Sequence, residues 1–227
     1  MGNRRDVRAA LDREAHISIA LGDLAAGGLP PLVWTDAGNG IRDAAGATAF
    51  PSSLALAASF DTDLARRHGE ALGREAKAAG RNAVLGPALD IARVPVAGRT
   101  GESFGEDPLL TGELGGSVAA GIQSQAVLAV VKHYLANNFE HGRTGSGSFA
   151  RRTHAVDVRI GAGTLRELYA EPFRRALVDY GAGGLMGSYN RLGGRYVCEN
   201  PALLRIPRAE WGWQGVIVPD FLFAVRD

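Results

Sequence analysis

Residues 127–134 read VLAVVKHY, an apolar run that ends in two basic side chains, Lys132 and His133, followed by Tyr134. A nearly continuous apolar run is typical of a strand that is buried on both faces, as in a parallel sheet covered by helices. Two adjacent basic groups at the end of such a strand need a reason, because burying a charge is costly unless it is paired. The stretch therefore predicts a buried parallel strand whose carboxyl end binds a ligand.

Strand-like and helical stretches alternate on both sides of this run. Further strands are expected at residues 31–36, 82–91, 153–160, 184–189 and 216–220. Helices are expected at residues 4–24, 64–79, 108–123 and 164–180, with a helical turn around 203–211. This alternation indicates parallel βα units, which build either a closed barrel or an open, doubly wound sheet.

The ends of the predicted strands favour the barrel. Polar residues stand there repeatedly: Asp36, Asp90, Lys132 with His133, Tyr189 with Asn190, and Asp220. A closed barrel gathers all its strand ends around one mouth, whereas an open sheet collects only those beside a switch point. No GxGxxG or Walker-type loop follows the first strand, so a nucleotide-binding sheet loses its main support. We predict an α/β fold, a TIM-type (β/α)8-like barrel that is incomplete at its C-terminal end, with residues 1–227 forming one domain.

Composition excludes several classes of partner. The chain has 227 residues, is 46% hydrophobic and 22% charged, and carries a net charge of +1, so nothing favours nucleic acid or an anionic membrane. The single cysteine, Cys198, cannot form an intramolecular disulfide or a zinc cluster. Residues 1–28 carry charges throughout, and no stretch approaches the roughly 20 apolar residues that cross a bilayer. The expectation is a soluble, cytoplasmic protein.

The candidate site residues have the chemistry of a sugar site. They are Asp36, Arg99, Lys132, His133, Arg143, Tyr189 and Asp220. Carboxylates and basic groups suit a sugar because each hydroxyl both donates and accepts, and a charged partner strengthens the hydrogen bond. An aspartate flanked by Arg, Lys and Tyr donors would keep a low pKa, which suits a nucleophile.

Several motifs carry a family resemblance. They are KHYLANNFE (132–140) with Arg143 following, GRTGESFGEDP (98–108), MGSYN (186–190), EWGWQG (210–215) leading to Asp220, and WTDAGNGIR (34–42). In this order they resemble the conserved blocks of glycoside hydrolase family 3, of the β-glucosidase type. The N-acetylglucosaminidase type carries a KHFPGHG-like stretch, which this chain lacks.

The resemblance implies a role for each position. Asp220 matches the nucleophile that forms a covalent glycosyl-enzyme. Asp36, Arg99, Lys132, His133 and Arg143 match residues that hold the non-reducing-end sugar, and Tyr189 matches the tyrosine that orients the nucleophile. The implied reaction is retaining hydrolysis of terminal β-linked glucose or xylose from a small glycoside or oligosaccharide, with two carboxyl groups and no metal or organic cofactor.

Three departures from the family pattern matter. Pro219 replaces a serine before the nucleophile and removes a backbone donor, and Phe221 replaces a tryptophan. The chain ends at Asp227, and no residue matches the family's general acid/base. We therefore expect a homodimer or a missing C-terminal domain to complete the barrel, and little turnover by the chain alone.

Other interpretations remain open at this point. The chain could be a sugar-binding fragment or remnant without turnover, whereas a metal- or phosphate-dependent enzyme lacks a carboxylate cluster and a phosphate loop. Single residues also have structural alternatives. Asp36 could cap a turn, Arg99 could pair with Glu102 or Glu106, and Tyr189 could be a core aromatic.

Overall fold

The main sheet is built from parallel strands. The computed structural model describes residues 31–145, 155–221 and 224. Its five-stranded sheet has the order β1 (Trp34–Asp36), β2 (Ala83–Ala88), β3 (Leu128–Tyr134), β5 (Gly184–Gly187) and β8 (Val216–Pro219), and every neighbouring pair is parallel. The run 127–134 is thus the central strand, β3, and its residues from Ala129 to Tyr134 are all buried.

The strand order identifies the type of parallel fold. It follows the chain without reversal from β1 to β8. A doubly wound sheet reverses its order at a switch point, whereas the wall of a (β/α) barrel does not. Among the described residues the wall stays open, with β1 and β8 at its edges. The predicted barrel-type α/β fold is confirmed, with its wall unclosed among the described residues.

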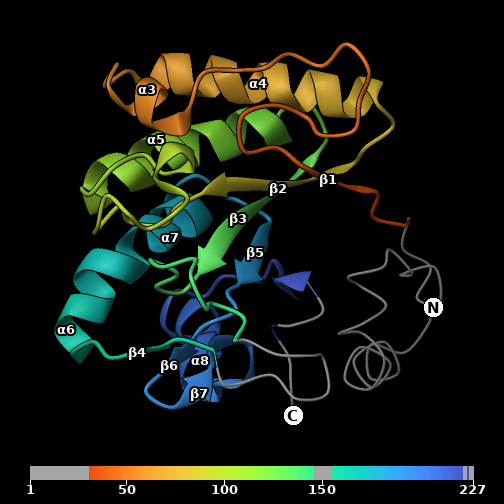
Figure 1. Cartoon of the computed structure of the whole chain (residues 1–227). Coiled ribbons are helices and arrows are strands. Elements are labelled where there is room, and N and C mark those ends of the chain that lie inside the picture. Colours follow the sequence, from red (N-terminus) through yellow and green to blue (C-terminus); the bar gives the residue numbers. More distant parts are fainter. Residues whose placement is uncertain (1–30, 146–154, 222–223, 225–227) are drawn as a thin grey trace, which may run out of the picture.

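Helices cover the outer face of this wall (Figure 1). They are α3 (Ser53–Ala57), α4 (Thr62–Ala78), α5 (Pro108–Gln123), α8 (Pro201–Arg205) and η7 (Ile206–Glu210), with short turns η2 (Thr100–Glu102) and η6 (Val197–Glu199). The Asp61 and Asp107 side chains cap α4 and α5 by accepting backbone N–H groups. The predicted helices at 64–79, 108–123 and the turn at 203–211 are therefore confirmed.

The predicted helix at 164–180 is confirmed in a less regular form. It consists of α6 (Ala162–Thr164), η4 (Leu165–Ala170), α7 (Glu171–Arg174) and η5 (Arg175–Asp179), and η4 and η5 are wider π-helical turns. Pro172 lies in α7, where its ring removes a backbone donor from the helical ladder. The predicted helix at 4–24 lies outside the described residues.

The prediction of a strand at 153–160 is wrong in its extent and its sheet. Only β4 (Asp157–Val158) forms, and it joins β6 (Arg191–Leu192) and β7 (Arg195–Tyr196) in a separate three-stranded sheet. Residues 153–154 lie outside the described part of the chain. The segment alternates polar and apolar side chains, and β4 is only half-buried, so it cannot form a strand of the buried wall.

Helices α4 and α5 pack with their backbones in close approach (Figure 1). A Cβ atom on Gly69 would lie 2.1 Å from the Val118 carbonyl oxygen, and one on Gly121 would lie 2.2 Å from the Arg66 carbonyl oxygen. Neither carbonyl can yield without moving its helix, so these glycines set the distance between α4 and α5.

Gly69→Ala should therefore destabilise the protein, although alanine normally favours a helix by roughly 0.5–1 kcal/mol. Overpacking of this kind costs about 1–3 kcal/mol in the free energy of unfolding, measurable by urea denaturation. Gly163→Ala is the matched control, since a Cβ atom on this helical glycine meets nothing within 4 Å. Equal stability of the two variants would contradict the packing account.

Candidate active site

The site begins where β3 ends, with a buried lysine. Lys132 is 3% exposed, and its ammonium lies 2.7 Å from Asp36 Oδ1 at the end of β1. Burial alone would raise the pKa of Asp36, but Lys132 outweighs it and holds that pKa below its usual range. Arg42 approaches the other oxygen of Asp36 at 3.7 Å. The pair ties the ends of β1 and β3 together.

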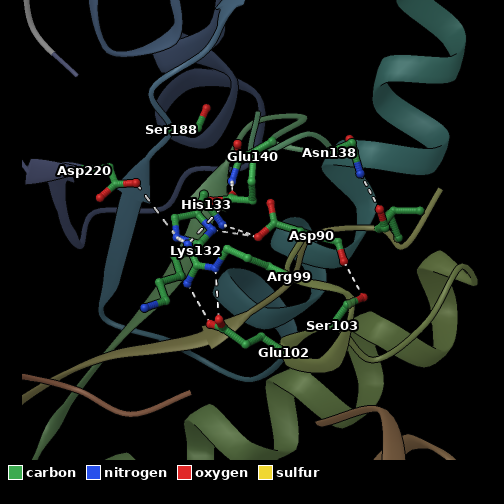
Figure 2. A network of polar contacts seen from close by, with 12 residues as sticks. Asp90, Arg99, Glu102, Ser103, Lys132, His133, Asn138, Glu140, Ser188 and Asp220 are labelled. Atoms are coloured by element: carbon green, nitrogen blue, oxygen red, sulfur yellow. Dashed lines mark hydrogen bonds and ion pairs between the residues drawn. The ribbon is translucent and has the colours of Figure 1, made fainter. Parts of the chain in front are cut away.

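His133 is held on both sides of its ring. Its Nδ1 lies 2.7 Å from Asp90 Oδ2, and Nη1 of Arg99 lies 2.9 Å from its Nε2 (Figure 2). A guanidinium can only donate, so Nε2 accepts and Nδ1 carries the proton. Burial together with the nearby Lys132 and Arg99 cations holds the pKa of His133 well below its usual range. The ring is therefore neutral.

Arginines of the site are fixed by glutamates. Arg99 donates from Nε and Nη2 to Glu102 at 3.0 and 2.6 Å, a two-point contact that orients the guanidinium plane. Arg143 lies 2.8 Å from Glu140, which also accepts from Asn137 at 3.1 Å. Each glutamate is thus already bound to donors in its own segment.

Asp220 directly follows the edge strand β8. Its backbone N–H donates to the Gly187 carbonyl at 2.8 Å, so the ladder bond beside β5 does not require a donor at Pro219. Its Oδ2 lies 3.6 Å from Nη1 of Arg143 and 3.9 Å from Nε2 of His133. Figure 2 shows Asp220 and Asp90 on opposite sides of the His133 ring. Oδ2 makes no hydrogen bond to any described residue.

The expected low pKa of Asp220 is wrong. Burial raises it above its usual range, and the Arg143 and Lys132 cations and a hydrogen bond from Tyr189 offset only part of this effect. Burial also raises the pKa of Tyr189, so its hydroxyl keeps its proton and can donate. The Arg143 guanidinium stacks 4.7 Å from the Tyr189 ring centroid. A desolvated carboxylate beside fixed donors is a stronger nucleophile than a solvated one.

The residues predicted for the site come together. Direct contacts connect Asp36 with Lys132, His133 with Arg99 and Asp220, and Arg143 with Tyr189 and Asp220. The predicted site set omits Asp90, Glu102 and Glu140, which orient its basic side chains. Asp90 stands among the strand-end polar residues, and Glu102 and Glu140 lie inside the quoted motifs. The sequence therefore indicates that these three residues matter, but it does not indicate which side chains they contact.

Other residues behave as packing. The Trp213 indole donates to the Ala182 carbonyl at 2.8 Å, and burial raises the pKa of Cys198 to about 12, so the thiol keeps its proton. Over residues 31–145, 155–221 and 224, no group of three or more His, Cys, Asp or Glu side chains could hold a metal ion. In the same ranges, no helix is long and apolar enough to span a membrane.

Comparisons with known proteins agree on one family. The sequence matches the model of the "Glycosyl hydrolase family 3 N terminal domain" over residues 4–226. "Probable beta-glucosidase H" of Neosartorya fischeri is 41% identical over 199 residues, which cover 86% of this chain and 23% of that protein. A β-glucosidase 3B from Thermotoga neapolitana, solved with α-D-glucose, is 34% identical with a TM-score of 0.79, covering 87% of this chain and 28% of that chain.

A second solved structure gives the same picture. The family 3 β-glucosidase of Bifidobacterium adolescentis is 30% identical with a TM-score of 0.83, covering 96% of this chain and 32% of that chain. This chain therefore spans less than a third of the length of these relatives.

Asp90→Asn should stabilise the protein in a pH-dependent way. Burial raises the pKa of Asp90 to about 7 from 3.8, so its ionised form destabilises the fold above pH 7. As the pH falls from 7 towards 3.8, the folded chain binds a proton before the unfolded chain does, and this cost disappears. The variant should exceed the wild type in unfolding free energy by a few kcal/mol, roughly, at pH 8, with the gap closing in acid.

Urea denaturation at several pH values measures this difference. Asp43→Asn is the control, because this side chain is exposed and solvated in the folded and unfolded chain alike. A gap for Asp90→Asn that stays constant between pH 8 and pH 4 would contradict the assignment of an ionisable, buried Asp90.

Proposed function

Because this chain belongs to glycoside hydrolase family 3, we propose that it forms the sugar-binding and nucleophile-bearing part of a retaining β-glucosidase. The proposed substrates are glycosides and oligosaccharides with a terminal, non-reducing β-D-glucosyl or xylosyl residue. The proposed nucleophile is Asp220, which attacks the anomeric carbon, and a glycosyl-enzyme results that water then hydrolyses.

The observation that carries the proposal is which carboxylates around His133 are already bound to other side chains. Asp36, Glu102 and Glu140 are each bound to a cation, and Asp90 lies behind the His133 ring. Asp220 Oδ2 lies 3.6 Å from Arg143 and 3.9 Å from His133, and no described residue hydrogen-bonds it. The other unpartnered oxygen, Asp90 Oδ1, belongs to the carboxylate behind the ring. Asp220 is therefore the carboxylate that we propose bonds to carbon.

The basic side chains suit a sugar in a fixed orientation. Lys132, Arg99 and Arg143 are each oriented by a carboxylate, so their remaining donors are fixed before a sugar arrives. Preorganised donors reduce the entropy lost on binding. Charge-assisted hydrogen bonds then distinguish a sugar whose hydroxyls reach them from one whose hydroxyls do not.

The general acid is proposed to come from outside this cluster. A general acid needs a raised pKa, but Arg99 outweighs burial at Glu102 and holds its pKa below its usual range. Glu140 is bound to Arg143. A further domain or a second copy of the chain would supply the acid, consistent with relatives that are much longer than this chain.

A sugar-binding module without turnover is the alternative. The burial of Asp220 favours it, since a raised pKa leaves less of the carboxylate ionised at low pH. The two functions differ in whether Asp220 forms a covalent bond, so a trapping experiment separates them.

A 2-deoxy-2-fluoro-β-glucoside with a good leaving group should label the protein stoichiometrically, and mass spectrometry should place the label on Asp220. Its leaving group departs without acid assistance, so this step needs no general acid. Asp220→Asn should abolish labelling and lower kcat by on the order of 10⁴-fold wherever the protein turns over.

Asp43→Asn serves as the control and should label like the wild type, because this exposed side chain lies outside the cluster. A label on another carboxylate would contradict the assignment of Asp220. Glucose binding without any label would support the binding module.

A further inference from the structure

Asp90 makes an unusual pair of contacts with one residue. Its Oδ2 accepts from the backbone N–H of His133 at 3.3 Å and lies 2.7 Å from Nδ1 of the same residue. Both partners donate, so Oδ2 must remain an acceptor. A proton taken up by Asp90 would lie on Oδ1, which makes no hydrogen bond to any described residue. The contact to the ring is therefore kept in either protonation state.

The opposite side of the ring imposes a matching constraint. Arg99 donates to Nε2 at 2.9 Å, and its guanidinium is itself fixed by Glu102. A proton on Nε2 would face this donor and repel it. It would also face Asp220 Oδ2 at 3.9 Å, the carboxylate proposed as nucleophile.

We infer that Asp90 is a positioning residue of the active site, which keeps the His133 proton on Nδ1 and the ring in one orientation. The inference rests on the proposed function of Asp220. Held in this way, His133 offers only a lone pair towards the reaction centre. It cannot donate to Asp220 and weaken it as a nucleophile, because its Nε2 lone pair accepts from Arg99.

The charges around the ring agree with this arrangement. Burial and the charges of Lys132, Arg99 and Arg143 lower the pKa of His133 and favour the neutral ring. The Asp220 carboxylate raises this pKa, but it does not outweigh them. Positive charge on the ring would add a cation to a cluster that already holds these basic side chains. The stable state is a neutral imidazole with two different nitrogens, and Asp90 decides which nitrogen carries the proton.

A purely structural role for Asp90 makes a different prediction. In that case Asp90 only accepts a hydrogen bond from the buried backbone N–H of His133. Removing the Asp90 carboxylate would then lower activity by the same factor with or without the imidazole. Asp90→Leu removes both contacts, whereas Asp90→Asn keeps a carbonyl acceptor at the position of Oδ2. His133→Ala removes the ring and leaves the backbone N–H.

Nitrogen-15 NMR of the full protein labelled at histidine tests the tautomer directly, with the His133 signals assigned from the spectrum of His133→Ala. We expect a protonated Nδ1 and an unprotonated Nε2 in the wild type and in Asp90→Asn between pH 6 and pH 8. A proton on Nε2 in the wild type would overturn the inference. This readout does not depend on hydrolysis, so it separates a failure here from a failure of the proposed function.

Kinetics on an activated β-glucoside tests the coupling. Asp90→Leu should lower kcat/KM by about 10–100-fold in the wild-type background and by less than about threefold in the His133→Ala background. Asp90→Asn should stay within a few-fold of the wild type. Equal losses for Asp90→Leu in both backgrounds, or an Asp90→Asn as damaged as Asp90→Leu, would overturn the inference. If Asp90→Leu does not fold, the tautomer measured in the wild type and in Asp90→Asn still decides.

Discussion

The structure depends on the burial of two basic side chains at the end of β3. Lys132 and His133 are 3% and 2% exposed, and neither can be buried without a partner. Asp36 at the end of β1 and Asp90 after β2 supply those partners at 2.7 Å each. The requirement to pair these groups ties three neighbouring strand ends into one polar cluster.

The remaining side chains of the cluster contact this pair directly or through one further residue. Arg99 reaches the free side of His133, Glu102 orients Arg99, and Glu140 orients Arg143 beside Asp220. Within this cluster, Asp36, Glu102 and Glu140 each pair with a cation. Asp220 Oδ2 makes no hydrogen bond to any described residue, and it is the group that the proposed reaction needs.

Much of this was predictable from the sequence, and the failures have physical causes. The buried strand at 127–134 and the helices at 64–79 and 108–123 depend on local patterns of apolar side chains, and the sequence predicts them. The segment 153–160 alternates polar and apolar side chains, which is typical of a half-buried strand, so only the short β4 forms there and it lies outside the wall. The low pKa expected for Asp220 counted its neighbours and neglected desolvation, which only tertiary burial reveals. The partner of His133 could not be predicted, since Asp90 lies 43 residues away and only the register of β2 and β3 brings them together.

The most direct test of the account is a crystal structure of the full protein with a glucose-derived ligand. Lys132, Asp36 and Arg99 should bind sugar hydroxyls, and a carboxylate oxygen of Asp220 should lie roughly 3–3.5 Å from the anomeric carbon. A ligand bound away from the ends of β1, β3 and β8, or an Asp220 turned away from the anomeric centre, would contradict it.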